Sequence, residues 1–197
     1  MDSDLHRRLI AIASDVSPEL RAHIAAAPIW FPYREDKGVT AFLARAVTGQ
    51  QVSAAAARSI WARVEAAGRD ELPAFLCERN TAALRRCGLS RNKIRALCHI
   101  GAAYAAGRLD SIEIRALNHA ARSARLTEIW GIGQWTCDMV AIFYCNELDI
   151  WPETDLAVIR GLKRFARRRK PSRVAAQFAP HRSLLALYMW RLAGAAM

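Results

Sequence analysis

The chain has 197 residues, of which 53% are hydrophobic and 24% charged, a composition typical of a globular protein and not of a disordered one. No apolar run reaches the roughly 18 residues of a membrane helix, and the acidic start is unlike a secretory signal. We therefore expect an intracellular protein, in the cytoplasm or nucleoid, or in the nucleus of a eukaryote. The net charge of +11 favours a polyanionic partner such as nucleic acid, although positive charge also serves solubility.

The five cysteines are an odd number with wide gaps, and no pair has Cys-x-x-Cys spacing. We expect no disulfide framework, no zinc site and no iron–sulfur cluster. Most of the thiols stand in helical, apolar segments, which predicts small core residues. They are Cys77, Cys87, Cys98, Cys137 and Cys145.

Helical signals dominate the first part of the chain. Ser17, followed by a proline and an acid, predicts the start of a helix. Apolar residues at helical spacing occur in 42–47, and the segment 49–53 interrupts them. A second amphipathic helix is expected over about 53–67, ended by Gly68.

Three shorter helices are expected next. The first covers 72–77, Asn80 is the candidate cap of the second at 81–87, and Ser90 is the candidate cap of the third. No segment shows the alternation of a strand, and no repeat of solenoid period is present. The predicted fold class is all-α, a compact set of short helices packed pairwise.

The most informative segment is 126–155, which reads LTEIWGIGQWTCDMVAIFYCNELDIWPETD. Within it, Gly131-Ile132-Gly133 separates a short apolar helix from a longer one. The glycines allow a tight turn, and the amides that open the next helix suit an anion such as a phosphate. Ile132 is expected to pack back against the helix pair. Taken alone, such a turn is as typical of an ordinary helical connection.

The residues after the hairpin form a more specific pattern. Trp135-Thr136 comes directly after it, and Pro152-Glu153-Thr154-Asp155 starts another helix, with Asp155 22 residues past Gly133. Here the chain resembles the helix-hairpin-helix DNA glycosylase superfamily, and most of all its alkylation-repair branch of the 3-methyladenine glycosylase II type. The resemblance spans roughly 36–192 and includes three further motifs: Gly49-Gln50-Gln51-Val52-Ser53, Gly88-Leu89-Ser90 with Lys93, and Arg182-Ser183 with Trp190.

The resemblance implies a compact helical form without the N-terminal β domain of larger family members. We expect two subdomains with a base pocket between them. Residues 1–35 and 150–197, at both chain ends, would form the first. Residues 36–149 would form the second, with the hairpin at 126–146.

The resemblance also implies a monofunctional glycosylase that hydrolyses the N-glycosidic bond of an alkylated purine flipped out of duplex DNA, in base excision repair. Asp155 would be the catalytic carboxylate, which stabilises positive charge on the sugar and orients water. An aspartate at a helix start is otherwise most typical of an N-cap. Bifunctional relatives have a nucleophilic lysine where this chain has Trp135, so no lyase activity is expected.

Base pocket and DNA contacts are implied in the same way. Trp135 and Trp190 would line the pocket, each with core packing as the alternative, and Met139 stands where relatives can have tyrosine. Gln51 would fill the gap left by the flipped nucleotide. The basic run 163–173 contacts phosphate or is a solvated surface. The residues expected to contact the DNA backbone are Gly131, Gly133, Gln134, Thr136, Arg160, Lys163 and Arg164.

No cofactor is expected for catalysis. The resemblance implies a structural Na⁺ or K⁺ held by the backbone carbonyls of Thr127, Ile129 and Gly131. The expected partner is double-stranded DNA with damaged bases, bound by a monomer. Two alternatives stay open: a non-catalytic helix-hairpin-helix module that binds DNA, and a glycosylase for another lesion, such as hypoxanthine or a deaminated or oxidised base.

Overall fold

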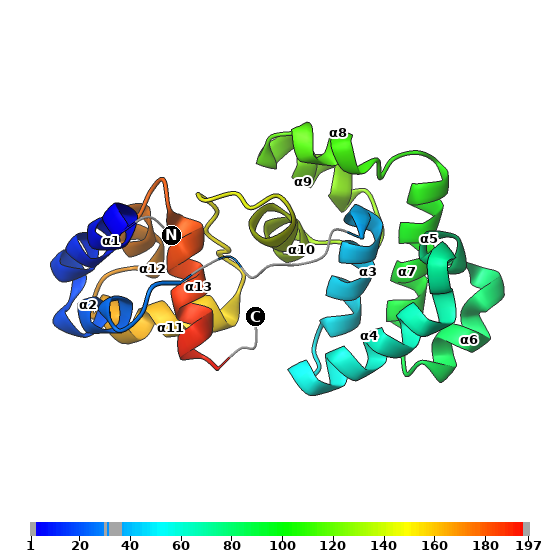
Figure 1. Ribbon diagram of the computed structural model, residues 1–197, viewed down its shortest axis with the longest axis horizontal. Coiled ribbons are helices and arrows are strands. Elements are labelled where there is room, and N and C mark those ends of the chain that lie inside the picture. The colour runs from blue at the N-terminus through cyan, green and yellow to red at the C-terminus, as the bar shows by residue number, and fades with distance from the viewer. Residues whose placement is uncertain (1–2, 30, 32–36, 195–197) are drawn as a thin grey trace. The chain divides into compact units, whose positions relative to one another are not determined.

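The computed structural model describes residues 3–29, 31 and 37–194, and all regular structure in these residues is helical, as the sequence predicts (Figure 1). The chain divides into two compact units. Unit 1 comprises residues 1–34 and 146–197, and unit 2 comprises residues 35–145. The chain thus returns to unit 1 at Asn146, where the sequence predicts a return at 150. None of the described helices is both long enough and apolar enough to cross a membrane.

Unit 2 is built from short helices joined by tight turns. Two of them, η1 and η2, are 3₁₀ turns, and η3 is a π-helical stretch that continues α10. In chain order they are α3 (Gly38–Gly49), α4 (Ala54–Gly68), η1 (Arg69–Glu71), α5 (Leu72–Phe75), η2 (Glu78–Asn80), α6 (Thr81–Arg86), α7 (Arg91–Ala105), α8 (Ser111–Ala116), α9 (His119–Thr127), α10 (Gln134–Met139) and η3 (Val140–Tyr144).

Most predicted helix starts are confirmed, with one correction. The Ser90 hydroxyl accepts the amide of Lys93 at the start of α7. Asn80 precedes α6 as predicted, but its side chain does not cap that helix. Its amide instead donates to the carbonyl of Phe75 (2.8 Å) and to the sulfur of Cys77 (3.4 Å). The side chain of Asn80 is therefore hydrogen-bonded to the preceding turn and not to α6.

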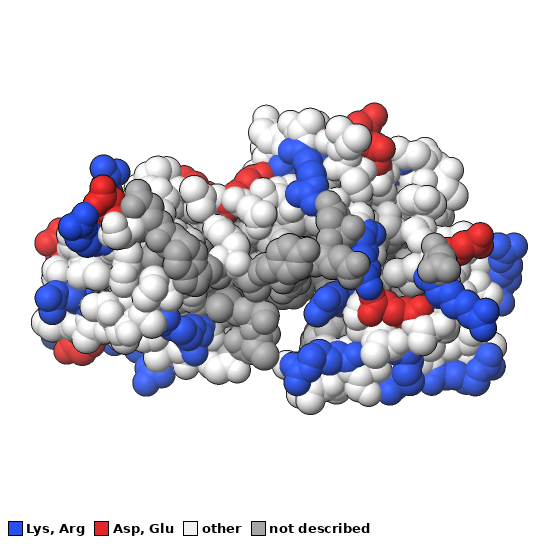
Figure 2. All heavy atoms as spheres, in the orientation of Figure 1, with Lys and Arg blue, Asp and Glu red and all other residues white. Residues whose placement is uncertain are grey.

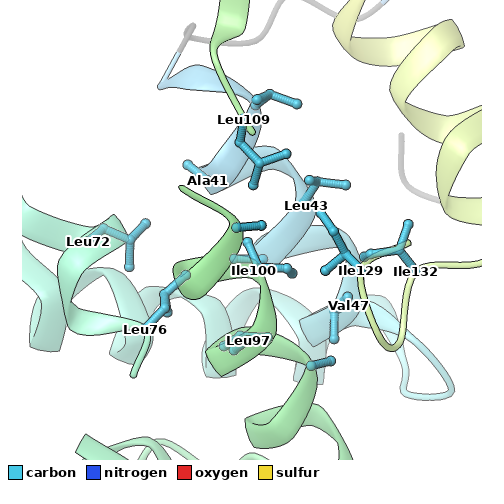
Figure 3. Close-up of a cluster of buried hydrophobic side chains, with 14 of the residues drawn as sticks. Ala41, Leu43, Val47, Leu72, Leu76, Leu97, Ile100, Leu109, Ile129 and Ile132 are labelled. Atoms are coloured by element: carbon cyan, nitrogen blue, oxygen red, sulfur yellow. The ribbon is translucent and has the colours of Figure 1, made fainter. Parts of the chain in front are cut away.

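The core of unit 2 joins the hairpin to α3 and α7. In Figure 3, Ile129 and Ile132 of the hairpin point toward Leu43 and Val47 of α3, and Ile100 of α7 lies in the same cluster. All five side chains are buried. The prediction that Ile132 packs back against the helices is confirmed, and the hairpin is thereby attached to a rigid core.

Unit 1 surrounds a buried helix. Residues 183–190 of α13 are all buried, so this helix has no polar face of its own over that stretch. The Ser17 hydroxyl accepts the amide of Leu20 (3.1 Å), which confirms the predicted cap. The helices of unit 1 are α1 (Ser3–Val16), α2 (Pro18–Ala25), α11 (Leu156–Ala166), α12 (Pro171–Ala176) and α13 (Arg182–Leu192).

Part of the basic run at 163–173 serves the fold of unit 1. Arg169 donates to the carbonyls of Asp15 and Val16 at the end of α1. Arg167 lies 3.9 Å from Glu19 in the first turn of α2. These arginines connect the loop after α11 to the first two helices, so the run is not wholly a solvated surface.

The cysteines divide by burial. Cys87 and Cys137 are buried, whereas Cys77, Cys98 and Cys145 are half-buried. Burial raises the pKa of the Cys137 thiol to about 11, which keeps it protonated and unreactive at neutral pH. The prediction that the thiols are core residues is thus confirmed for Cys87 and Cys137, whereas the other three are only partly buried.

Candidate active site

Asp155 is a buried carboxylate with two engaged oxygens. It is the N-cap of α11, and its Oδ1 atom accepts the amide of Val158 (2.9 Å). Its Oδ2 atom accepts the indole N–H of Trp190 (3.2 Å), and the residue is 8% exposed. The interpretation of Asp155 as a helix cap is therefore correct. The side chain is thus held by one donor at the helix N-terminus and by a second donor on the indole ring.

Trp190 reaches Asp155 with its edge. It lies near the end of α13 and is 6% exposed. The resemblance suggested a wall of the base pocket, and the structure adds a hydrogen-bonding role that the sequence did not reveal. Because the ring is held on a buried helix, it orients the carboxylate firmly.

The other residues of the late motif hold the segment that leads to Asp155. Arg182 forms a bidentate pair with Asp149, at 2.7 and 3.0 Å. The Ser183 amide donates to the carbonyl of Leu148, and its hydroxyl accepts the amide of Ile150, both at 2.9 Å. Hydrogen bonding from the guanidinium lowers the pKa of Asp149 below its usual value. The motif thus connects α13 to segment 148–150.

The two hairpin glycines have different surroundings. Gly131 has a φ of +89°, and a Cβ built on it would lie 2.6 Å from the Cβ of Ala96 on α7. Only glycine meets both requirements without strain. Gly133 is extended and caps α10 without a side chain, and nothing lies within 4 Å of its own Cβ position. Of the two glycines, it is therefore Gly133 that has open space beside its backbone, at the start of α10.

Two of the residues that follow the hairpin bond to other side chains of unit 2. Gln134 is exposed and donates to the buried carboxylate of Asp138 (2.8 Å), which also lies 3.2 Å from Nε2 of His119. Thr136 is buried, and its hydroxyl accepts the side-chain amide of Gln50 (3.4 Å). The side chain of Thr136, a residue expected to contact the DNA backbone, thus connects α10 to the turn after α3.

That turn presents Gln51. The residue is exposed and has a φ of +56°, unusual for a residue with a side chain. Nζ of Lys93 donates to the carbonyls of Thr48 (2.9 Å) and Gln50 (2.7 Å), and its burial lowers the pKa of the lysine. Lys93 thereby closes the C-terminal end of α3 and holds the turn. Sequence reasoning found this lysine as part of a motif but missed its function.

Trp135 and Met139 lie one turn apart on α10. Trp135 is half-buried, and Met139 is buried without belonging to the core cluster of unit 2. With Gln51 they belong to unit 2, whereas Asp155 and Trp190 belong to unit 1.

Basic residues are exposed on α11, the helix that Asp155 caps. Arg160, Lys163 and Arg164 are all exposed there. On the face shown in Figure 2, basic side chains outnumber acidic ones. These residues suit contact with a polyanion.

The hairpin carbonyls have the donor chemistry of a monovalent cation site. Ile129 O accepts the amide of Ile132 (3.0 Å) and keeps a second lone pair. Within the described part of the chain, no turn or loop amide donates to the carbonyls of Thr127 and Gly131. Neutral oxygens of this kind fit Na⁺ or K⁺. No group of three acidic, histidine or cysteine side chains gathers as metal ligands in residues 3–29, 31 and 37–194.

A cavity of about 460 Å³ lies elsewhere in unit 2. Its lining comes from α5, η2 and α7 and includes Leu76, Cys98 and Tyr104. None of the predicted site residues lines it.

Comparison with known proteins identifies relatives over most of the chain. The chain is 32% identical over 170 residues, which are 81% of it and 72% of the relative, to DNA-3-methyladenine glycosylase 1 of Schizosaccharomyces pombe. It is 28% identical over 160 residues, 75% of each chain, to the alkylbase DNA glycosidase-like protein mag2 of the same yeast. No protein-family model matches the chain.

Solved structures agree. The S. pombe 3-methyladenine DNA glycosylase Mag1 in complex with abasic DNA matches with a TM-score of 0.82 and 27% identity, over 95% of this chain and 97% of that one. DNA-3-methyladenine glycosidase of Bacillus halodurans matches with a TM-score of 0.71 and 28% identity, over 90% of each. The hairpin, the buried Asp155 and these relatives agree: the chain belongs to the DNA-3-methyladenine glycosylase family.

Proposed function

We propose that this chain is a monofunctional DNA glycosylase that removes alkylated purines of the 3-methyladenine type from duplex DNA. The observation that carries the proposal is Asp155, buried and held by two donors at a helix N-terminus. Support comes from the relatives, two of which are named for 3-methyladenine, and from the Mag1 complex, since an abasic site is what base removal leaves behind.

The carboxylate would act on the sugar. In the reaction the bond from C1′ to the base nitrogen breaks, and its electron pair leaves with the base. Positive charge grows on the sugar and is stabilised by the ionised Asp155. A water oxygen then bonds to C1′, and its proton passes through Asp155 to solvent. A ring-alkylated purine already carries positive charge, so the base leaves without an added proton.

The side chains of unit 2 would handle the flipped nucleotide. Trp135 and Met139, one turn apart on α10, offer an aromatic face and a polarisable sulfur to a cationic base. Gln51, exposed on its turn, would occupy the gap in the duplex. Since Trp135 stands at the position of the lyase lysine, no Schiff base forms and the DNA strand stays intact.

The DNA backbone would be held by two groups of contacts. The hairpin supplies Gly131, Gly133 and Gln134, where no side chain obstructs a phosphate at Gly133. The carbonyls of Thr127, Ile129 and Gly131 would hold Na⁺ or K⁺, which supplies a positive charge for the same phosphate. From α11, Arg160, Lys163 and Arg164 add exposed charge. We propose that the protein acts as a monomer within the cell, where its DNA substrate is.

The test is base release from methylated duplex DNA, with the freed bases identified by chromatography. Wild-type protein should release 3-methyladenine and leave an alkali-labile abasic site. Asp155→Asn keeps a good helix cap, so the variant should fold normally yet lose about 10²–10⁴ in rate. Full activity of the variant would show that the assigned mechanism is wrong.

Two other results would replace the proposal. Tight DNA binding by the wild type without any released base indicates a binding module. Release of hypoxanthine or an oxidised base from single-lesion duplexes, but not of 3-methyladenine, indicates a glycosylase for another lesion.

A further inference from the structure

An exposed tryptophan stands in the hairpin itself. Trp130 directly precedes Gly131 and keeps 37% of its surface exposed, although Ile129 on its other side is buried in the core. A single exposed apolar side chain is common on protein surfaces; what distinguishes this ring is the cation stacked on it.

The ring is covered on one face by a cation from α7. Cζ of Arg95 lies 4.2 Å from the centroid of the Trp130 ring, and the ring of His99 lies 5.9 Å away, tilted by 34°. Arg95 and His99 are one helical turn apart and both are exposed. Stacking on the indole holds the guanidinium in place and leaves its N–H edge free to donate.

The close approach of the hairpin to α7 fixes this arrangement. A Cβ at Gly131 would meet that of Ala96 at 2.6 Å, so the turn lies directly against the residue after Arg95. The carboxylate nearest to Trp130 in sequence, Glu128, lies 3.6 Å from Arg108. Arg95 has no carboxylate partner within the described residues. The patch therefore carries uncompensated positive charge.

We propose that Arg95, His99 and Trp130 form a second phosphate-binding patch, which holds the backbone of duplex DNA beside the phosphate bound at the hairpin. The proposal rests on the proposed DNA-binding function. The patch adjoins the hairpin in the same unit, and its charge is complementary to DNA. Arg95 donates to phosphate oxygens, Trp130 orients it, and His99 adds an imidazole N–H.

The experiment measures affinity for a fluorescein-labelled duplex that contains a tetrahydrofuran abasic analogue, in salt from about 50 to about 200 mM. For Arg95→Gln, the slope of log K against log salt should become shallower by about 0.9, the value for one lost phosphate contact. Trp130→Ala should reduce affinity about tenfold, because the guanidinium is no longer held. Trp130→Phe should recover most of this loss.

The matched control is Arg86→Gln, which removes the same charge from an exposed position at the end of α6. Its slope should equal that of the wild type. An unchanged slope for Arg95→Gln, or an equal change for both variants, overturns the patch. The patch would also be overturned if Trp130→Ala lowered the affinity and Arg95→Gln had no effect. The ring would then act without the guanidinium.

Failure of the proposed function is seen separately. It appears as absent base release by the wild type on methylated DNA, whereas the salt series uses a duplex on which no bond is broken. Thermal unfolding of each variant accompanies the binding data, and Arg95→Lys, which keeps the charge, should retain the wild-type slope.

Discussion

The indole nitrogen of Trp190 lies 3.2 Å from Oδ2 of Asp155, although 35 residues separate them in sequence. This hydrogen bond joins the buried helix α13 to the N-cap residue of α11. It leaves the carboxylate with one oxygen on the backbone amide of Val158 and the other on an indole. The orientation of the proposed catalytic group is thus built into the core of unit 1.

Replacing Trp190 by phenylalanine tests that orientation. Trp190→Phe keeps an aromatic ring but removes the only donor of the side chain. A hydrogen bond to a charged group contributes about 1.5–3 kcal/mol, so the single-turnover rate of base release should fall about 10- to 100-fold. Quenched-flow measurement at saturating enzyme gives this rate. A rate within twofold of the wild type would leave the indole without a role in catalysis.

The pair of Asp149 and Arg182 predicts a dependence of stability on pH. The guanidinium lowers the pKa of Asp149 below its usual 3.8. The contribution of the pair to stability is therefore present above pH 3.8 and is lost as the pH falls through the folded-state pKa. Because both side chains are about one-third exposed, at 35% and 36%, the contribution should be about 1 kcal/mol or less.

Urea unfolding of wild type and Arg182→Gln at a series of pH values measures this contribution. The difference in free energy of unfolding should be constant near neutral pH and should shrink below about pH 4. A difference that grows in acid has the wrong sign for this pair.

The hairpin glycines predict two contrasting alanine variants. Gly131→Ala places a side chain at positive φ and against Ala96, so it should reduce the free energy of unfolding by about 2–4 kcal/mol. Gly133→Ala meets open space and should cost less than about 1 kcal/mol, but it should weaken DNA binding about tenfold because the methyl group obstructs the phosphate. Denaturant unfolding and fluorescence anisotropy separate the two effects. Equal loss of stability in both variants would contradict the structure.

Lys93 predicts an effect that depends on the DNA substrate. Lys93→Met keeps the aliphatic stem but removes the donor to the carbonyls of Thr48 and Gln50, with a loss of about 1–3 kcal/mol in stability. The turn that presents Gln51 loosens, so base release from duplex DNA should fall more than release from a single strand, which leaves no gap to fill.

The control is Lys37→Met, at the opposite end of α3, where the lysine forms an exposed pair with Glu65 (3.2 Å). It should leave the ratio of the two rates unchanged. An equal fall on both substrates in Lys93→Met would limit this lysine to a structural role.

Local sequence patterns were sufficient to predict most of the helices and the order of the candidate site residues along the chain. Ser17 and Ser90 cap helices where the sequence predicted caps, because an N-cap needs only a side chain three residues from the amide it accepts. The burial of Ile132 was predictable from an apolar residue between two glycines. Asn80 was assigned wrongly because its side-chain N–H group donates back to the carbonyl of Phe75, while its side-chain oxygen accepts no amide of α6.

Contacts between distant residues required the fold. Neither the pair of Asp149 and Arg182 nor the donation from Lys93 to backbone carbonyls has a signature in composition or spacing, since each depends on which distant segments the fold brings together. The same holds for the indole on Asp155. The sequence alone determines which side chains are present and which helices they lie on. The packing of those helices in three dimensions determines which partners the side chains bond to.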